Sequence, residues 1–448
     1  MPTRRDFLMM SLLSGAMIAI NTSAFARQGV SGEVKGASAI TQVFGDGIRM
    51  TAVAVEYDEA ISGASLNKAD FSVEGRTVTG VFASTSANPA DQAAEGHFVI
   101  VTLSPEDANA PLAQKMDAKP GGQPPSSGGH GGPGKAGDIP VYDTSYASPV
   151  AKVHQTGDLK AESGRRLAAT PTTLTTTKVE NLVVDDFESL TFTDAKTGKM
   201  LRYNLFVPKH YDPKQTYPLV LFMHDAGATS DVTRSTLYQG LGAIAWASPS
   251  DQAQRPAFVL APQYAEIIAD DDSKTSDALD ATIHLITSLT ERYSIDRNRL
   301  YATGQSGGCM MSIAMNIKYP TFFAASFLVA GQWDPALVKP LAKQKLWILV
   351  SQDDDKAFPG QNAITEVLKK EGVKVATAVW EGTWSAEQFR KASQAIEDQD
   401  CPVNYVSFAK GTVIPPNQSG AGASGHRNTW RIAYTIEPIR EWLFRQHR

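Results

Sequence analysis

The sequence predicts a two-domain protein in which a small all-β domain precedes a larger α/β domain. Short runs with a period of two residues, separated by Gly, Asn and Asp, fill residues 39–104 and return over 150–184. Such runs are typical of a β-sandwich. Beyond about residue 185, continuous apolar runs alternate with helical patterns. That alternation predicts a mainly parallel sheet with helices on both faces.

The composition is that of a globular protein with a large core. The chain has 448 residues, 42% of them hydrophobic, which favours two or three domains. A net charge of −5 disfavours nucleic acid as a partner. The only cysteines, Cys309 and Cys401, exclude a disulfide scaffold and a cysteine-rich zinc module, and we expect both thiols to be free.

The N-terminus carries an export signal pattern. Arg4 and Arg5 precede an uncharged run over residues 7–20, and the small-x-small pattern of a cleavage site follows at 24–26. The arginine pair resembles a twin-arginine signal, and the apolar run is too short to span a bilayer. We therefore predict that residues 1–26 are removed and that the mature protein is periplasmic or secreted. An uncleaved anchor is the alternative, and no later stretch is apolar enough to span a membrane.

The all-β domain is expected to cover residues 35–180 and to contain an insertion. Gly and Pro make up 11 of the 15 residues from Pro120 to Gly134. Such a stretch buries too little apolar surface to offset its ordering entropy. Because the β pattern resumes at residue 150, we place a disordered insertion at about 105–147, inside this domain.

The α/β domain is expected over residues 181–448. Leu279, Ile283 and Ile286 recur at helical spacing and predict one of its helices. The predicted strands are 201–207, 217–223, 257–261, 300–303, 324–329 and 346–350.

Residues 304–308 match the motif G-x-S-x-G. The motif lies between the predicted strand 300–303 and a helical pattern beginning at Cys309. A strand, a tight glycine turn and a helix form the nucleophile elbow of α/β-hydrolases, which predicts Ser306 as the nucleophile. A plain strand-to-helix turn is the alternative.

The base that activates the serine should follow it in the chain, since α/β-hydrolases have the order Ser, Asp or Glu, His. Only two of the eight histidines, His426 and His447, follow Ser306. His447 is the penultimate residue, where helix ends fray. His426 lies in a Gly- and Ser-rich loop and is therefore the predicted base.

The acid should stand between them at a strand end. Asp353, Asp354 and Asp355 follow the strand 346–350, and one of them should orient the imidazole. Asp334, which follows the strand 324–329, is the alternative.

An oxyanion hole needs two backbone N–H groups. Gly307, directly after the serine, should supply one. The other should come from the loop after strand 217–223, where Ala226 is the first choice and Asp225 the second.

Three further residues follow strand ends and are candidates for substrate binding: Gln263, Gln332 and Trp333. Core packing or hydrogen bonding to the backbone is the alternative for each.

With these residues placed, the sequence resembles secreted bacterial esterases that join an N-terminal immunoglobulin-like (Ig-like) domain to an α/β-hydrolase. The resemblance is carried by residues 52–57, 203–208, 224–227, 260–264 and 330–333. Residues 296–301 also resemble polyhydroxyalkanoate depolymerases, feruloyl esterases and prolyl-oligopeptidase-like hydrolases. The resemblance implies an Ig-like fold for residues 35–180. It also implies an acid at the second aspartate of an Asp-x-Asp stretch, which selects Asp355.

We therefore expect an exported serine carboxylesterase with the triad Ser306, Asp355 and His426 and with no metal or organic cofactor. Its substrate would be a small-molecule or polymeric ester. The alternatives are a prolyl-oligopeptidase-like peptidase, a polyester or feruloyl ester depolymerase, and a surface- or polymer-binding protein with an inert hydrolase domain. Neither nucleic acid nor stable membrane insertion is expected after signal removal. The Ig-like domain is a candidate surface for homo-oligomerisation.

Overall fold

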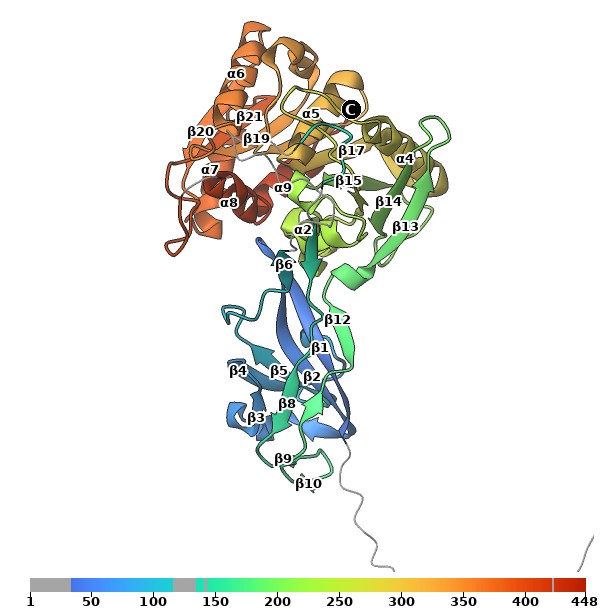
Figure 1. Cartoon of the computed structure of the whole chain (residues 1–448), viewed down its shortest axis with the longest axis vertical. Coiled ribbons are helices and arrows are strands. Elements are labelled where there is room, and N and C mark those ends of the chain that lie inside the picture. Colours follow the sequence, from blue (N-terminus) through green and yellow to red (C-terminus); the bar gives the residue numbers. More distant parts are fainter. Residues whose placement is uncertain (1–33, 116–133, 141–142, 421–422) are drawn as a thin grey trace, which may run out of the picture.

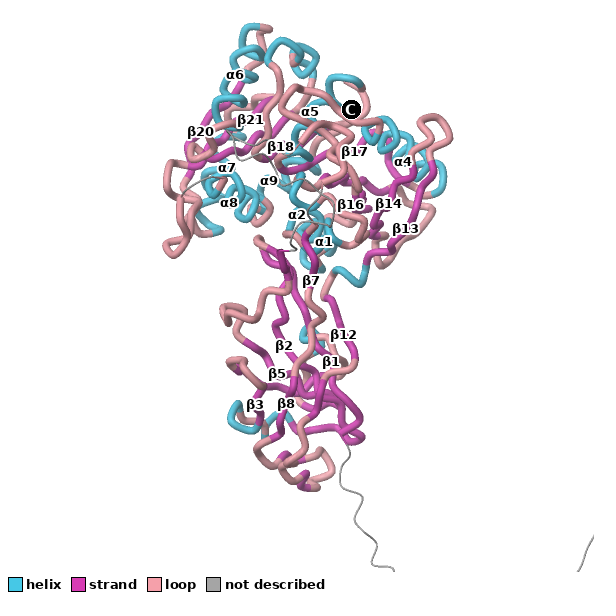
Figure 2. The backbone as a smooth tube through the Cα atoms, viewed as in Figure 1, coloured by secondary structure: helices cyan, strands magenta, loops and turns pink. Residues whose placement is uncertain are grey.

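The computed structural model describes residues 34–115, 134–140, 143–420 and 423–448 (Figure 1). The predicted export signal and most of the Gly/Pro-rich stretch lie outside these residues. A β domain and a larger α/β domain stack end to end, and long helices occur only in the larger one (Figure 2). None of the described helices is long and apolar enough to cross a membrane.

The first domain is a β-sandwich. Its strands are β1 (Val34–Phe44), β2 (Gly47–Ser62), β3 (Phe71–Val73), β4 (Val78–Ser84), β5 (Glu95–Leu103), β8 (Lys152–Gln155), β9 (Leu159–Lys160), β10 (Arg166–Leu167), β11 (Leu174–Thr175) and β12 (Lys178–Asn181). A sheet in the order β12-β1-β2-β5-β4 packs against a second in the order β11-β8-β3. Alternation along β2 explains the packing, because Val53 and Val55 enter the core between the sheets while Ala52 and Ala54 join a small cluster on the other face.

The two ends of the predicted insertion are ordered, which differs from the sequence prediction. β6 (Ala113–Lys115) and β7 (Thr144–Tyr146) pair antiparallel. The ring of Tyr146 contacts that of Tyr238 in the α/β domain, with centroids 4.9 Å apart. Contacts with the second domain therefore supply the burial that composition alone does not indicate.

The second domain is built on a nine-stranded sheet in the order β13-β14-β16-β15-β17-β18-β19-β21-β20. Its strands are β13 (Phe187–Thr193), β14 (Met200–Phe206), β15 (Tyr217–Met223), β16 (Phe258–Gln263), β17 (Ile295–Gln305), β18 (Ala325–Val329), β19 (Leu346–Ser351), β20 (Val375–Trp380) and β21 (Val403–Phe408). The pairs β13–β14 and β14–β16 are antiparallel, and the remaining pairs are parallel.

Helices cover both faces of this sheet. They are α1 (Ser235–Tyr238), α2 (Leu241–Ala247), α3 (Pro249–Gln254), α4 (Ala278–Arg292), α5 (Gly307–Lys318), α6 (Ala357–Lys370), α7 (Ala386–Glu397), α8 (Ser424–Ala433) and α9 (Glu437–Phe444). In β15, Leu219 and Leu221 belong to the core cluster that includes residues of α4, α5 and α6, whereas Val220 and Phe222 belong to the cluster that includes residues of α2, α8 and α9. The predicted α/β-hydrolase architecture is confirmed.

The hydrophobic core is continuous from one domain to the other. A single cluster joins Val53 and Phe71 of the sandwich to Phe222 and Ile432 of the α/β domain. At the junction, the turn between β1 and β2 lies against α8, because a Cβ added at Gly45 would come within 2.7 Å of Cγ of Arg431. The two domains therefore share a packed contact.

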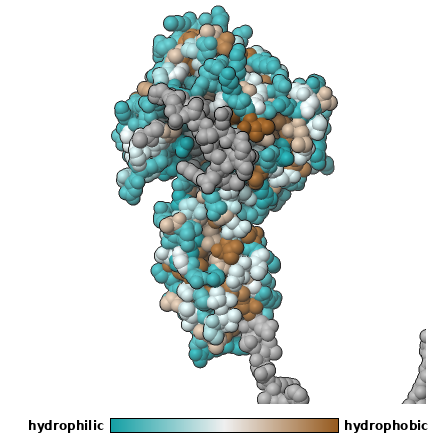
Figure 3. Space-filling view, viewed as in Figure 1, coloured by the Kyte–Doolittle hydropathy of each residue, from teal (hydrophilic) through white to brown (hydrophobic). Residues whose placement is uncertain are grey.

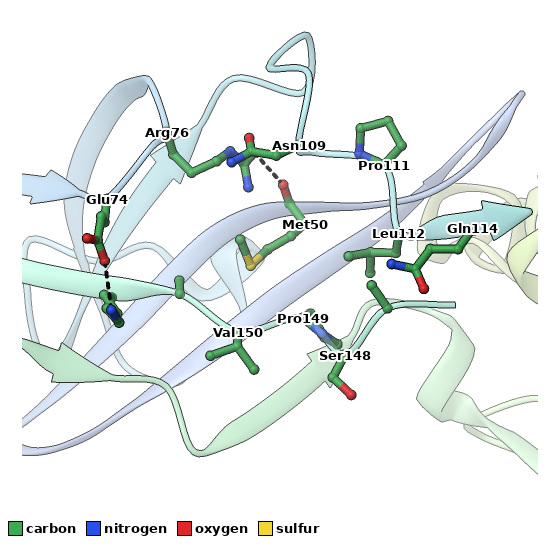
Figure 4. Close-up of a pocket in the computed structure, with 13 residues that line it drawn as sticks. Met50, Glu74, Arg76, Asn109, Pro111, Leu112, Gln114, Ser148, Pro149 and Val150 are labelled. Atoms are coloured by element: carbon green, nitrogen blue, oxygen red, sulfur yellow. Dashed lines mark hydrogen bonds and ion pairs between the residues drawn. The ribbon is translucent and has the colours of Figure 1, made fainter. Parts of the chain in front are cut away.

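A pocket of about 480 Å³ lies in the β-sandwich, between the start of β6 and the segment leading into β8 (Figure 4). Arg76 on its wall donates to the backbone oxygen of Met50 and forms an ion pair with Asp107. Both contacts belong to the sandwich itself. On the face seen in Figure 3, the described residues of both domains are mostly hydrophilic or of intermediate hydropathy, with small hydrophobic patches.

Candidate active site

Ser306 occupies a strained turn between β17 and α5. Its φ of 51° and ψ of −117° lie where non-glycine residues are rare, as at a nucleophile elbow. Gly308 makes the turn possible, because a Cβ at this position would lie 2.8 Å from the backbone oxygen of His224 and still closer to that of Met223. The glycines of the motif are therefore required for close packing against the end of β15.

The imidazole of His426 reaches Ser306. Its Nε2 lies 2.8 Å from Oγ of Ser306, so it can accept the serine proton. His426 stands in the first turn of α8 rather than in a loop, so the helix begins earlier than the glycine-rich sequence suggests. The ring of Trp430, one turn further along, packs edge-on against the imidazole, with the ring centroids 4.9 Å apart.

The carboxylate that contacts the imidazole of His426 is that of Asp354, not that of Asp355. His426 Nδ1 donates to Oδ2 of Asp354. Oδ1 of Asp354 accepts the N–H groups of Lys356 and Ala357 at 3.1 and 2.8 Å, at the start of α6. These bonds turn the Asp354 side chain inward, where it is 4% exposed, while Asp355 faces solvent.

The carboxylates of Asp353 and Asp334 accept hydrogen bonds from backbone N–H groups elsewhere. Asp353 accepts the N–H of Gly411, and Asp334 accepts the N–H of Ala336 at the start of a short helical turn. The structure therefore brings together Ser306, His426 and Asp354, and it does not bring Asp334, Asp353 or Asp355 to the imidazole.

The two predicted oxyanion donors lie on facing segments. Gly307 is the first residue of α5, where a backbone N–H has no partner within the helix. A Cβ added at Gly307 would lie 3.6 Å from the backbone nitrogen of Ala226. Asp225 supports this loop with its carboxylate, which accepts the N–H of Gly227 at 2.8 Å and Nε2 of Gln305 at 3.0 Å. Asp225 thereby ties the loop to the residue that precedes the nucleophile.

Beneath this loop lies a buried network around His224. Nδ1 of His224 donates to the backbone oxygen of Asp225 at 2.7 Å, and Nε2 accepts the N–H of Tyr264 at 3.0 Å. Burial lowers the pKa of His224 despite the opposing effect of Asp225, so the ring stays neutral and keeps this donor and acceptor arrangement.

Gln263 belongs to the same network. It is 2% exposed, its Nε2 donates to the backbone oxygen of Ala228 at 2.8 Å, and its Oε1 accepts the N–H of Thr236 at 2.7 Å. Its polar atoms are therefore engaged by the two loops around it.

The other two substrate-binding candidates differ in exposure. Trp333 is buried in the core cluster with Met310 and Val338, so it packs rather than faces a substrate. Gln332 is partly exposed and donates to Oδ1 of Asp271 at 2.8 Å. Of the three candidates, only Gln332 lies at the surface.

Both cysteines are free thiols. Cys309, in α5 directly behind the elbow, is fully buried, and burial raises the pKa of its thiol, which disfavours the thiolate. Among the described ranges, no group of three or more His, Cys, Asp or Glu side chains could hold a metal ion.

Comparison with known proteins assigns both domains. Residues 36–168 match the family of esterase Ig-like N-terminal domains. A thermostable esterase has a similar structure, with a TM-score of 0.74 and 26% identity, over 93% of this chain and 100% of that one. A comparison with curated proteins gives no match. The family match and the thermostable esterase both support an ester hydrolase.

More distant likenesses cover the chain in part. The feruloyl esterase module from Clostridium thermocellum gives a TM-score of 0.39 and 12% identity, over 56% of this chain and 86% of that one. A ferulic acid esterase from Anaeromyces mucronatus gives a TM-score of 0.36 and 13% identity, over 57% of this chain and 91% of that one.

Proposed function

We propose that this chain, which joins the Ig-like domain of an esterase family to an α/β-hydrolase domain, is a serine carboxylesterase. The observation that carries the proposal is the position of His426 between Ser306 and Asp354. One imidazole nitrogen lies 2.8 Å from the serine oxygen, and the other is bonded to a buried carboxylate. A neutral imidazole held in this way is a base directed at the serine proton.

The reaction follows from this arrangement. Oγ of Ser306 attacks the ester carbonyl carbon while Nε2 of His426 takes its proton, and Asp354 stabilises the imidazolium that forms. The N–H groups of Gly307 and Ala226 donate to the carbonyl oxygen as it becomes negative. Collapse of this adduct expels the alkoxide, which receives the proton from His426. Water then attacks the acyl-serine, with His426 again as base, and releases the acid and the free serine.

Ester turnover by Ser306→Ala tests the nucleophile. We expect kcat on a short p-nitrophenyl ester to fall by at least about 10³-fold, since the residual rate comes from binding and the oxyanion donors alone. A serine-directed phosphonate should add one mass increment at Ser306 in the wild type and none in the variant. Unchanged turnover in Ser306→Ala would contradict the proposal, and faster cleavage of peptide anilides than of esters would replace it with a peptidase.

We also propose that the protein is exported through the twin-arginine route. The support is Arg4 and Arg5 before the apolar run and the cleavage pattern ending at Ala26. Changing Arg4 and Arg5 together to lysine should leave the full-length precursor in the cytoplasm, whereas the wild type should yield a periplasmic or secreted chain starting near Arg27. Export of the double variant at the normal level would exclude this route.

A further inference from the structure

We propose that the loop 267–275 of the α/β domain forms a wall of the ester-binding cleft and that a turn from the Ig-like domain's insertion positions this wall. In this proposal the turn Lys135–Asp138 holds the loop 267–275 in place through the carboxylate of Asp270, and Asp271 on that loop is a specificity-determining residue. The proposal rests on the esterase function above. Its elements are the turn, the loop and the contacts that the loop makes beside the catalytic residues.

The turn closes on itself. The N–H of Asp138 donates to the backbone oxygen of Lys135 at 2.9 Å, and the Asp138 carboxylate accepts the N–H of Lys135 at 2.8 Å. Gly137, the third residue, has a φ of 93°, while Ala136 is not among the residues with positive φ. Together these features define a type II β-turn, in which proline is well tolerated at the position of Ala136.

This turn is bound to the α/β domain. Gly137 N–H donates to the backbone oxygen of Ile267, and Ile267 N–H donates to that of Asp138, both at 2.8 Å. The N–H of Ala136 donates to Oδ2 of Asp270 at 2.9 Å. Seven residues further on, Asp143 accepts a hydrogen bond from Ser230, which follows the oxyanion loop. Figure 1 shows the described part of this segment, in teal, among the elements of the α/β domain.

Asp270 is the centre of the loop. Its side chain is 5% exposed, and its Oδ1 accepts the N–H groups of Asp272 and Lys274, both at 3.0 Å. A buried carboxylate needs such donors, because each one lost leaves charge without compensation. Ala136, on the insertion, supplies the donor to the second oxygen. The shape of the loop therefore depends on a residue from the other domain.

The far side of the loop reaches the catalytic segments. The carboxylate of Asp271 accepts Nε2 of Gln332 at 2.8 Å and forms an ion pair with Nζ of Lys356 at 2.7 Å. Lys356 N–H donates to the catalytic Asp354. Gln332 follows Gly331, where an added Cβ would lie 3.0 Å from the backbone oxygen of Ser306. Asp271 thus links the segment beside the nucleophile to the segment beside the acid.

A substrate that enters beside Ser306 meets this loop, and the position of Asp271 sets the width that remains. If the loop moves, esters with large acyl groups should respond differently from esters with small ones, because a small group needs less of the wall. The expected signature is a change in the ratio of kcat/KM for p-nitrophenyl octanoate to that for p-nitrophenyl acetate.

The first variant is Ala136→Pro. Proline fits the second position of this turn and removes only the N–H that binds Asp270, while Ala136→Ser keeps that donor and is the matched control. We expect the octanoate-to-acetate ratio to change at least about fivefold in Ala136→Pro and to stay within twofold in Ala136→Ser. Circular dichroism establishes whether each variant folds.

The second variant, Asp271→Asn, tests the role of the loop even if Ala136→Pro does not fold. Asp272→Asn makes the same charge change on the next residue, whose carboxylate has no hydrogen bond or ion pair within the described residues. The ratio should change in the first variant and not in the second. An unchanged ratio in folded Asp271→Asn, or an equal fall on both esters, would overturn the proposal.

A second readout separates this proposal from the proposed function. The rates at which a methyl- and a hexyl-phosphonate label Ser306 report access to the serine without turnover. A changed labelling ratio in a protein that hydrolyses no ester would keep the wall and refute the esterase. Normal ester hydrolysis with an unchanged labelling ratio would keep the proposed esterase function and refute the wall.

Discussion

Asp354 and Asp355 are neighbours in the chain, yet their environments are opposite. The sequence indicates an acid within residues 353–355, because three aspartates follow a predicted strand. It cannot select one of them, since the choice depends on which carboxylate points inward. Asp354 is turned inward by the first N–H groups of α6 and meets His426, while Asp355 points to solvent. Ser306 and His426 could be predicted because one motif and the order of the chain are enough to choose them.

If Asp354 is the acid of the triad, removing its charge and removing that of Asp355 should affect kcat very differently. Asp354→Asn should lower kcat by about 10³–10⁴-fold, because an amide can donate to Nδ1 and favour the wrong imidazole tautomer. Asp355→Asn, one residue away, should leave kcat within about twofold. Steady-state kinetics on a p-nitrophenyl ester compares them, and a larger loss in Asp355→Asn would reverse the assignment.

At the scale of elements, the site depends on how closely α8 approaches the loop after β19. Gly425, just before His426, lies so near Asp353 that an added Cβ would be 2.7 Å from the Asp353 backbone oxygen. The Gly- and Ser-rich sequence before His426 predicts a loop at this position. The reason is that glycines at 420, 422 and 425 weaken the helical pattern, whereas tertiary packing decides where the helix begins.

Gly425→Ala should separate His426 from its partners. Alanine favours the helix, but its methyl group cannot fit against the backbone of Asp353, so the first turn of α8 must shift. A displacement of about 1 Å at a catalytic group costs up to about 10²-fold in rate, so we expect kcat to fall by about 10- to 100-fold. Arg427→Ala, on the exposed side of the same turn, is the control and should keep wild-type kcat. A Gly425→Ala enzyme with normal kcat would show that the contact tolerates a methyl group.

At the scale of the whole molecule, both domains were predictable from local patterns, but their junction was not. Alternation along β2 and continuous apolar runs such as β15 reflect which faces are buried, so they identify a sandwich and a parallel sheet. The junction involves residues without such a signal, including Gly45 against Arg431 and Asp185 paired with Arg234. Contacts between distant segments leave no periodicity in either of them.

Gly45 lies at this junction, where it contacts Arg431 of α8. In Gly45→Val the new side chain would meet Cγ of Arg431 at 2.7 Å and its backbone oxygen more closely still, on the helix that carries His426. Gly36→Val is the matched control, because a Cβ there has no atom within 4 Å, and Gly36 lies in β1, the strand that leads into the turn at Gly45. We expect Gly45→Val to lower the free energy of unfolding by about 1–3 kcal/mol, as overpacking does, and Gly36→Val to change it little. Calorimetry should show a lower Tm for Gly45→Val. Because Arg431 and His426 both lie on α8, a displacement of Arg431 by the valine should also shift His426 and reduce kcat. Equal Tm values for the two variants would show that the domains do not depend on this contact for their stability.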